Sequence, residues 1–338
     1  KHWEYWPMWV TYLPGAFYFY ALALRSRALC FFSAVNPSIE NGGMFFQSKK
    51  ETYSLIPKEY LPTTICFEAN VSMEEVERLL KESSLNFPII AKPDRGERGW
   101  LVKILNNFQE LEKYISHIRR PFIVQAFINQ HIEVGIFYSR HPKEENGIIS
   151  SITGKTLLEV KGDGHSSLRE LINKNDRAYL QLPTIEHQQL VDLDSILASG
   201  EVKTLVKIGN HSRGTTFLDW NHRNSKRLTN QIDIISKRIH GFYYGRFDIL
   251  CQSLEDLAEG KNFYILELNG AGAEPAHIYQ PGFSFLKAQK VIFWHIHRMH
   301  QIAVANHQSG IPFMSFLQFI YQKKKEKAYK KGLSNTTL

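Results

Sequence analysis

The pattern of apolar and polar positions predicts a chain in which short strands alternate with helices. Apolar runs of strand length are predicted at residues 87–92, 101–105, 122–125, 133–138, 147–153, 156–160, 202–208 and 215–218. Helical periodicity predicts helices at residues 72–83, 107–118, 168–173, 231–240 and 285–307. Ser72 and Ser167 each begin a Ser-x-x-Glu capping box at the start of such a helix. This mixture predicts the α+β class.

Two further apolar runs, 246–251 and 263–268, are predicted to be neighbouring strands. The first carries Asp248 and the second carries Glu267, with Asn269 two residues later. Side chains alternate along a strand, so Glu267 and Asn269 project from the same face. If the runs pair as a hairpin, the oxygens of all three side chains come together, and such hard ligands suit Mg²⁺ that carries nucleotide phosphates. The alternative is a half-buried hairpin with solvated acids.

A loop with two glycines and two arginines, residues 93–100, separates two of the predicted strands. Backbone N–H groups and guanidinium groups in such a loop can fold over phosphates. Lys92 ends the preceding strand and is placed to meet a phosphate oxygen. The alternative is an ordinary hairpin.

The opening segment, residues 6–24, contains no charge and is closed by Arg25 and Arg27. Its length approaches the roughly 20 residues of a membrane-spanning helix. However, Pro14 and Gly15 fall near its middle, and aromatic residues occur throughout it instead of at two interfaces. Three interpretations remain: an aromatic segment buried on the domain, an interfacial membrane anchor and a spanning helix.

Composition and charge narrow the class of protein. An apolar content of 43% and a charged content of 22% in 338 residues indicate a globular chain. The formal net charge is +8, with six lysines in the last sixteen residues, which predict a solvated helix end or a contact for anionic lipid or nucleic acid. The remainder is only mildly basic, so no nucleic acid partner is predicted. Three widely spaced cysteines predict free thiols and a cytoplasmic location, with membrane association as the alternative.

Several of these motifs occur in an order that resembles the ATP-grasp superfamily. Lys92 precedes a Gly-rich loop, Glu133 follows about forty residues on, and Arg-x-Asp at 246–248 precedes Glu-x-Asn at 267–269. The likeness is to D-alanine–D-alanine ligase and to the ATP-grasp domain of cyanophycin synthetase, and it covers residues 87–279. It implies an ATP-grasp fold in which two α+β subdomains clasp ATP. The expected divisions are an aromatic N-terminal region (1–68), a small subdomain with the phosphate loop (69–126), a large subdomain with the metal site (127–310), and a C-terminal helix with a basic tail (311–338).

The resemblance also implies a nucleotide site. Lys92 would hold the α- and β-phosphates, and the loop 94–99 would fold over the triphosphate. The backbone of residues 125–128 would bind the adenine edge, and Glu133 would accept the ribose hydroxyls. The full implied set is Lys92, Arg95, Gly96, Arg98, Gly99, Gln125, Ala126, Phe127, Ile128 and Glu133.

The implied chemistry is that of a carboxylate–amine ligase. ATP phosphorylates a carboxylate and an amine attacks the acyl phosphate, so ADP and phosphate are released and the enzyme contributes positioning and charge neutralisation. Lys155 would contact the phosphates, and Arg246 would stabilise the acyl phosphate and the oxyanion. Arg213 is a candidate contact for substrate or phosphate. Two Mg²⁺ ions, with Mn²⁺ as an alternative, would be bound by Asp248, Glu267 and Asn269.

The chain departs from D-alanine–D-alanine ligases after Asn269. Residues 270–279 read GAGAEPAHIY and lack the Pro-Gly-Met-Thr and later Ser of those enzymes, so ligation of D-alanine is not expected. Glu274 and His277 either cover the sheet end, the preferred interpretation, or receive a substrate group. An alternative function is an inactive ATP-binding or membrane-surface adaptor, motivated by residues 6–24 and the lysine-rich tail.

Overall fold

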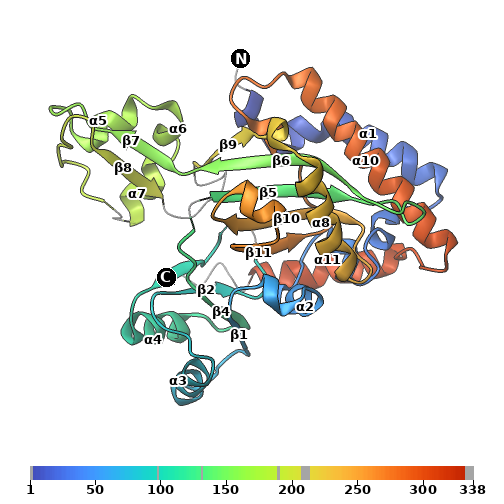
Figure 1. Ribbon diagram of the computed structural model, residues 1–338, viewed down its shortest axis with the longest axis horizontal. Coiled ribbons are helices and arrows are strands. Elements are labelled where there is room, and N and C mark those ends of the chain that lie inside the picture. The colour runs from blue at the N-terminus through green and yellow to red at the C-terminus, as the bar shows by residue number, and fades with distance from the viewer. Residues whose placement is uncertain (1–2, 97–98, 131, 189–190, 207–213, 332–338) are drawn as a thin grey trace.

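A computed structural model gives the structure of the protein and describes residues 3–96, 99–130, 132–188, 191–206 and 214–331. The strands of the described residues form a four-stranded, a five-stranded and a two-stranded sheet, all antiparallel (Figure 1). Helices pack against each sheet. The predicted α+β class is therefore confirmed.

The small sheet has the strand order β1-β4-β2-β3. Its elements are β1 (Thr64–Phe67), β2 (Ile89–Pro93), β3 (Lys103–Leu105), β4 (Phe122–Ala126) and two helices, α3 (Met73–Glu82) and α4 (Phe108–His117). Ser72 caps α3 by accepting a hydrogen bond from the backbone of Glu75, as the sequence predicts. The apolar faces of both helices cover one side of the sheet and give this subdomain a core of its own.

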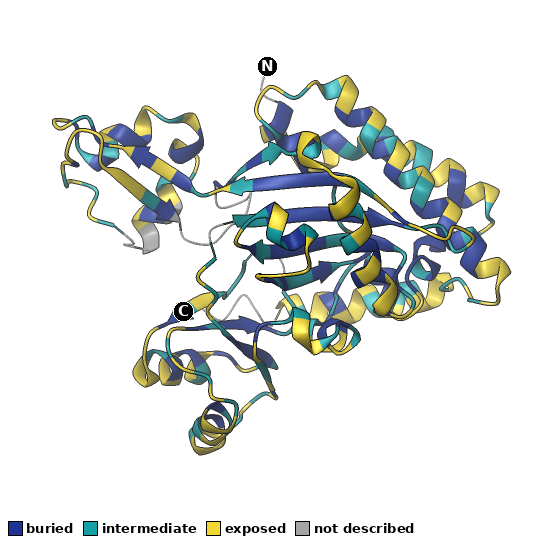
Figure 2. Ribbon diagram, viewed as in Figure 1, coloured by how far each residue is buried: buried dark blue, intermediate teal, exposed yellow. Residues whose placement is uncertain are grey.

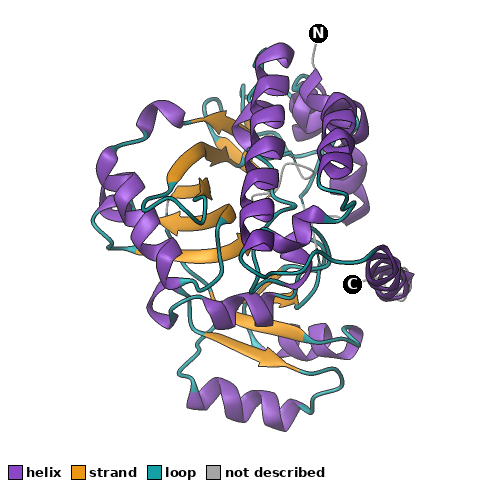
Figure 3. Cartoon of the chain, turned by 90° about the vertical axis from the view of Figure 1, so that its right-hand side faces the viewer, coloured by secondary structure: helices purple, strands orange, loops and turns teal. Residues whose placement is uncertain are grey.

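The large sheet has the order β11-β10-β5-β6-β9. Its strands are β5 (Ile132–Ser139), β6 (Ile148–Thr156), β9 (Thr216–Asp219), β10 (Tyr244–Cys251) and β11 (Phe263–Asn269). Apolar residues of α8 (Lys226–Arg238) and α9 (Leu254–Ala258) pack on one face, and α10 (Phe285–Gln308) packs on the other (Figure 3). The sheet is largely buried between these layers (Figure 2).

A third lobe projects from the large sheet, at the left of Figure 1. It consists of β7 (Leu158–Lys161), β8 (Val202–Val206) and three short helices, α5 (Leu168–Asn173), α6 (Asp176–Tyr179) and α7 (Leu182–Gln188). Ser167 and Glu170 form the predicted capping box at the start of α5. These elements share a separate apolar core.

The N-terminal segment forms one helix, α1 (Met8–Arg25), through Pro14 and Gly15. It runs parallel to α10, as two contacts show. Trp3 packs on Phe285 near the N-terminal ends of the two helices, and Ser26 hydrogen-bonds His300 near their C-terminal ends. Among the described residues, no helix has both the length and the apolarity needed to cross a bilayer. The helices α2 (Lys49–Leu55) and α11 (Phe316–Lys331) complete the part of the fold that surrounds the candidate site.

Candidate functional site

The register of β10 and β11 gathers four polar side chains at one end of the large sheet. Asp248 lies directly opposite Glu267, and Arg246 lies opposite Asn269. Directly opposed residues of antiparallel strands share a face, and so do residues two apart on one strand. The structure therefore brings together the three side chains that the sequence suggested as metal ligands, with Arg246 beside them.

The Asp248 carboxylate is the centre of a buried charge cluster. Arg246 donates from Nε to Oδ1 at 2.8 Å and from Nη2 to Oδ2 at 3.1 Å, a two-pronged contact. Lys155 Nζ, from β6, lies 3.7 Å from Oδ2 and also donates to the Glu133 carboxylate of β5. Two cations and two anions from three strands thus neutralise one another.

Mutual attraction keeps these groups ionised in spite of burial. Burial raises the pKa of the Asp248 carboxyl, but Arg246 and Lys155 outweigh it and the net pKa lies below the ordinary value. Burial lowers the pKa of Lys155, and the charges of Asp248 and Glu133 raise it further than burial lowers it. Asp248 and Lys155 are therefore both ionised at neutral pH.

Gly135 supplies the space that the cluster needs. It is the β5 partner of Asp248. A Cβ atom at this position would lie 3.3 Å from Arg246 Cδ and 3.4 Å from Asp248 Oδ1. Sequence reasoning missed this residue, although a glycine inside a predicted strand is a signal for a close approach.

Lys92 lies where the small sheet meets the large one. From the end of β2, its Nζ donates to the Tyr53 hydroxyl at 2.8 Å, to Gln125 Oε1 at 3.1 Å and to the Leu266 carbonyl of β11 at 3.4 Å. Burial lowers the pKa of Lys92 to about 8, and the negative charge of Glu267 opposes that effect. A buried amine beside the acidic strand is well placed to meet an anion that enters between the sheets.

A second lysine joins this region, and the sequence did not suggest it. Lys49, on α2, has its Nζ 3.9 Å from Glu267 Oε1. The same amine donates to the carbonyl oxygen of Gly96 at 3.0 Å. Lys49 therefore links the Gly-rich loop to the acidic end of β11.

The remaining nucleotide-side residues lie around β4 and the Gly-rich loop. Gln125 and Ala126 end β4, Phe127 is exposed and Ile128 is half-buried. Gly99 has a φ of 70°, which glycine adopts readily. Arg98 and Arg213 lie outside the described residues.

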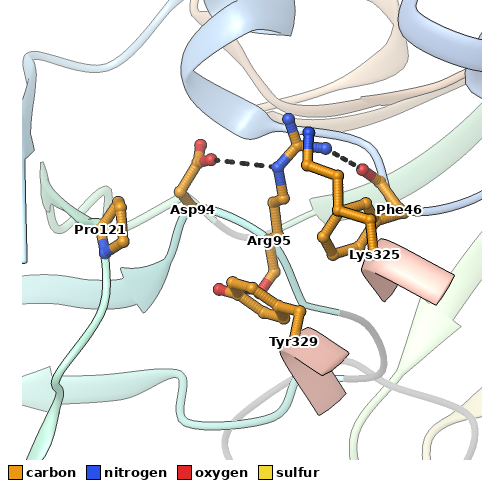
Figure 4. A pocket seen from close by; sticks show the side chains of 6 residues that line it. All are labelled: Phe46, Asp94, Arg95, Pro121, Lys325 and Tyr329. Carbon is orange, nitrogen blue, oxygen red and sulfur yellow. Dashed lines mark hydrogen bonds and ion pairs between the residues drawn. The ribbon is translucent and has the colours of Figure 1, made fainter. Parts of the chain in front are cut away.

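The guanidinium of Arg95 is engaged by the N-terminal region. It donates to Glu40 Oε2 at 2.8 Å. It also donates to the Phe46 carbonyl and lies over the Phe46 ring at 4.5 Å (Figure 4). Tyr329 of α11 donates to the Arg95 carbonyl at 3.1 Å. Phe46, Asp94, Arg95, Pro121, Lys325 and Tyr329 line a pocket of about 270 Å³ (Figure 4). In this conformation Arg95 anchors the loop to α11 and to the N-terminal region.

The loop after β11 packs over Arg246. The Glu274 carbonyl accepts from Arg246 Nη1 at 3.2 Å, and Glu274 Oε1 accepts from the Tyr279 hydroxyl at 3.0 Å. His277 is buried, with its Nδ1 2.7 Å from Ser151 Oγ, and burial lowers its pKa. The loop therefore covers this end of the sheet.

The donor set at the end of β11 fits a hard divalent ion. Asp248 and Glu267 supply carboxylate oxygens, and the Asn269 amide has a buried nitrogen with no hydrogen-bond partner among the described residues. Amide oxygen and nitrogen are interchangeable in shape, so this amide has spare capacity for a ligand. Within the described residues, no three Asp, Glu, His or Cys side chains form a metal-binding group. An ion here would need the Asn269 amide and oxygens from a bound phosphate.

Comparison with known proteins gives distant similarity to solved ligase structures of the ATP-grasp class. They include a bifunctional glutathione synthetase from Pasteurella multocida (17% identity, 72% of this chain and 36% of that one, TM-score 0.42). A D-Ala:D-Ser ligase from Enterococcus faecalis is 14% identical over 76% of this chain and 62% of that one, with a TM-score of 0.43. A D-alanine–D-alanine ligase from Bacillus anthracis is 12% identical over 78% of this chain and 69% of that one, with a TM-score of 0.44.

These structures are of the class that the sequence motifs resemble. The chain spans about a third of the length of the glutathione synthetase and 62% of the D-Ala:D-Ser ligase. With TM-scores below 0.5, they are too distant to indicate what this chain does. No protein-family model matches the chain, and no curated protein matches it.

Proposed function

We propose that this protein is an ATP-dependent carboxylate–amine ligase that forms a C–N bond through an acyl phosphate, with release of ADP and phosphate. The observation that carries the proposal is the meeting of a buried cation from the small sheet with cations and acids of the large sheet. Lys92 Nζ of the small sheet reaches the Leu266 carbonyl, next to Glu267. Arg246, Asp248 and Lys155 lie on the large sheet beside them.

In this mechanism the side chains position the nucleotide and neutralise the charge of its phosphates. Lys92 and Lys155 bind phosphate oxygens, and Glu133 exchanges its contact with Lys155 for one with the ribose when nucleotide enters. Asp248, Glu267 and Asn269 would hold Mg²⁺ or Mn²⁺, and such an ion would supply additional neutralisation of phosphate charge. Positive charge that is already ordered before the reaction favours the transition state because no reorganisation is needed.

Arg246 is suited to the acyl-transfer half of the reaction. Asp248 fixes its guanidinium from one side, and the Glu274 carbonyl fixes it from another. A rigid guanidinium can accept the negative charge that develops on the substrate carboxylate. The substrates are a small carboxylate and an amine. D-Alanine is not favoured, because the loop 270–279 lacks the motif of D-alanine ligases.

We also infer a reducing, cytoplasmic compartment. Cys30, Cys66 and Cys251 all have free thiols, and two of them are buried. A chain that matured in an oxidising compartment would be expected to pair its cysteines.

ADP release tests the function. Purified protein is assayed with ATP and Mg²⁺ against pooled amino acids and small carboxylates, and Glu267→Gln should reduce ADP release at least about 100-fold, the scale seen when a group that stabilises transition-state charge is removed. Glu259→Gln is the matched control, because both carboxylates are partly exposed and lie near one lysine each. The control should keep full activity.

Two results would contradict the proposal. If Glu267→Gln turned over ATP as fast as the unsubstituted protein, β11 would not be part of the active site. If ATP bound but no substrate pool released ADP, the protein would be an ATP-binding adaptor.

A further inference from the structure

The helix α1 has two apolar faces, and the fold accounts for one of them. Its inner face packs closely on α10: a Cβ atom at Gly15 would lie 2.9 Å from Ile292 Cγ2, and the Tyr18 hydroxyl lies 2.7 Å from His297 Nδ1. The outer face consists of residues spaced four, four, three and four positions apart, which lie on one side of a helix. These residues and their exposed fractions are Trp9 (71%), Leu13 (47%), Phe17 (70%), Tyr20 (56%) and Leu24 (80%).

An outer face of this composition is unusual for a helix on the surface of a protein. Such helices normally present charged and polar side chains to water, whereas α1 has no charged residue before Arg25. A continuous exposed apolar stripe marks a surface that another body covers. Trp and Tyr within the stripe suit an environment with an apolar side and a polar side.

The charge around the helix indicates the chemistry of that body. The helices α1 and α10 contain Arg25, Lys287, Lys290 and Arg298 and no Asp or Glu. Of these four, Arg298 is paired with Glu144. Arg25 and Arg27 are exposed at the C-terminal end of α1, and Lys287 and Lys290 are exposed on α10.

This combination favours a membrane surface over a second copy of the chain. In a symmetric dimer the same patch faces itself, so like charges would meet across the contact. An anionic bilayer offers the opposite charge together with an apolar layer below it. We propose that α1 lies flat on anionic membranes, with the stripe from Trp9 to Leu24 inserted at the level of the lipid headgroups.

The geometry of α1 agrees with interfacial binding. With 18 residues the helix is about 27 Å long at 1.5 Å per residue, so it offers its whole length to the surface. The inner face also places Tyr12 beside Glu274 and Tyr279, next to the candidate active site. One helix therefore contacts the membrane with one side and the site with the other.

Vesicle sedimentation tests the proposal on the chain of 338 residues. The protein should sediment with vesicles of equal parts phosphatidylcholine and phosphatidylglycerol, and much less with phosphatidylcholine alone. Trp9→Ser/Phe17→Ser should weaken binding at least about 100-fold, because each lost side chain contributes a factor of ten or more through its buried apolar area. The matched control is Leu180→Ser/Ile234→Ser, which removes two side chains with exposed fractions of 55% and 53% outside α1.

A second pair of variants tests the charge. Arg25→Gln/Arg27→Gln should weaken binding to the anionic vesicles about ten-fold or more, and raised salt should have the same effect. Circular dichroism and the midpoint of thermal unfolding check that each variant is folded. Because the stripe is exposed, Trp9→Ser/Phe17→Ser should match the unsubstituted protein in both.

Three outcomes would overturn the proposal. The first is recovery of the protein in the supernatant with both kinds of vesicle. The second is binding of Trp9→Ser/Phe17→Ser as strong as that of the control variant. The third is a concentration-dependent dimer in sedimentation velocity that Trp9→Ser/Phe17→Ser dissociates, which would make a second copy the occupant of the stripe.

Discussion

Replacing Lys92 with Met removes a buried cation but retains most of the side-chain volume. We expect the variant to be more stable than the unsubstituted protein near neutral pH, although it loses a group that the proposed function requires. Burial lowers the pKa of Lys92 from 10.5 to about 8. This difference between the ordinary and the lowered pKa corresponds to about 3 kcal/mol of destabilisation of the folded state when the amine is protonated.

The loss of the hydrogen bonds of the amine reduces the stability that Lys92→Met gains. Gln125 Oε1 loses a donor when Lys92 is removed, whereas the Leu266 carbonyl keeps the hydrogen bond from the Tyr53 hydroxyl. A lost partner for a buried acceptor costs about 1 to 2 kcal/mol. The free energy of unfolding should therefore increase by about 1 to 2 kcal/mol at pH values near neutrality.

The pH dependence distinguishes this cause from a change in packing. Between about pH 8 and 10.5 the unfolded chain binds more protons at Lys92 than the folded protein does, so the stability of the unsubstituted protein rises with pH in this window. The penalty is fully present below about pH 8 and is lost as the pH approaches 10.5. The stability advantage of Lys92→Met should therefore shrink over the same window.

Urea unfolding of both proteins at about pH 7 and about pH 10 measures this difference. Lys103→Met, at an exposed position on the same small sheet, is the control and should change the free energy of unfolding by less than about 0.5 kcal/mol at either pH. ATP binding by Lys92→Met should be at least about ten-fold weaker. An equal stability difference at the two pH values, or a loss of stability at the lower one, would refute the burial argument.

Three further substitutions test the charge cluster and the core. Asp248→Asn leaves Arg246 without its carboxylate partner, so the free energy of unfolding should fall by about 3 kcal/mol in urea titrations and ADP release should be lost. In the unsubstituted protein the stabilisation from Asp248 should be present above its ordinary pKa of 3.8 and disappear as the pH falls through the lowered value. Gly135→Val should reduce ADP release with little loss of helix signal in circular dichroism, because a Cβ atom there approaches Arg246. Asp233→Ala removes the acceptor of a 2.6 Å hydrogen bond from Tyr138 and should cost about 2 to 3 kcal/mol of unfolding free energy without changing the KM for ATP.

The acidic hairpin could be predicted because its geometry follows from local rules. Alternation along a strand places Glu267 and Asn269 on one face, and antiparallel pairing of neighbouring strands brings Asp248 opposite Glu267. The position of Lys92 at a strand end beside the Gly-rich loop could be predicted, whereas its contact with phosphate stays a prediction. Each inference needed only residues that are close in sequence or on adjacent strands.

The contacts made by α2 could not be predicted in this way. Tyr53 and Lys49 reach Leu266 and Glu267 across more than 200 residues of sequence, and no motif surrounds them. Their positions depend on how the small sheet packs against β11, which periodicity does not report.

Arg95 illustrates a different limit of sequence reasoning. A loop rich in glycine and arginine predicts a phosphate contact, but the loop pattern contains no information about competing partners. Glu40 and the Phe46 carbonyl engage the Arg95 guanidinium, and Tyr329 holds its backbone from the other end of the chain. Closure of this loop over a triphosphate would have to release or reorient these contacts.

The N-terminal segment shows why composition alone left three interpretations open. Residues 6–24 are apolar at almost every position, so the pattern has no polar face that would tell which side is buried. The structure divides the segment: Gly15 and Tyr18 face α10, whereas Trp9 and Phe17 face outward. Packing on α10 explains Gly15 and Tyr18, but it does not explain why Trp9 and Phe17 are apolar. Since the Trp9 and Phe17 side chains are about 70% exposed, their presence is better explained by a surface that lies outside the chain.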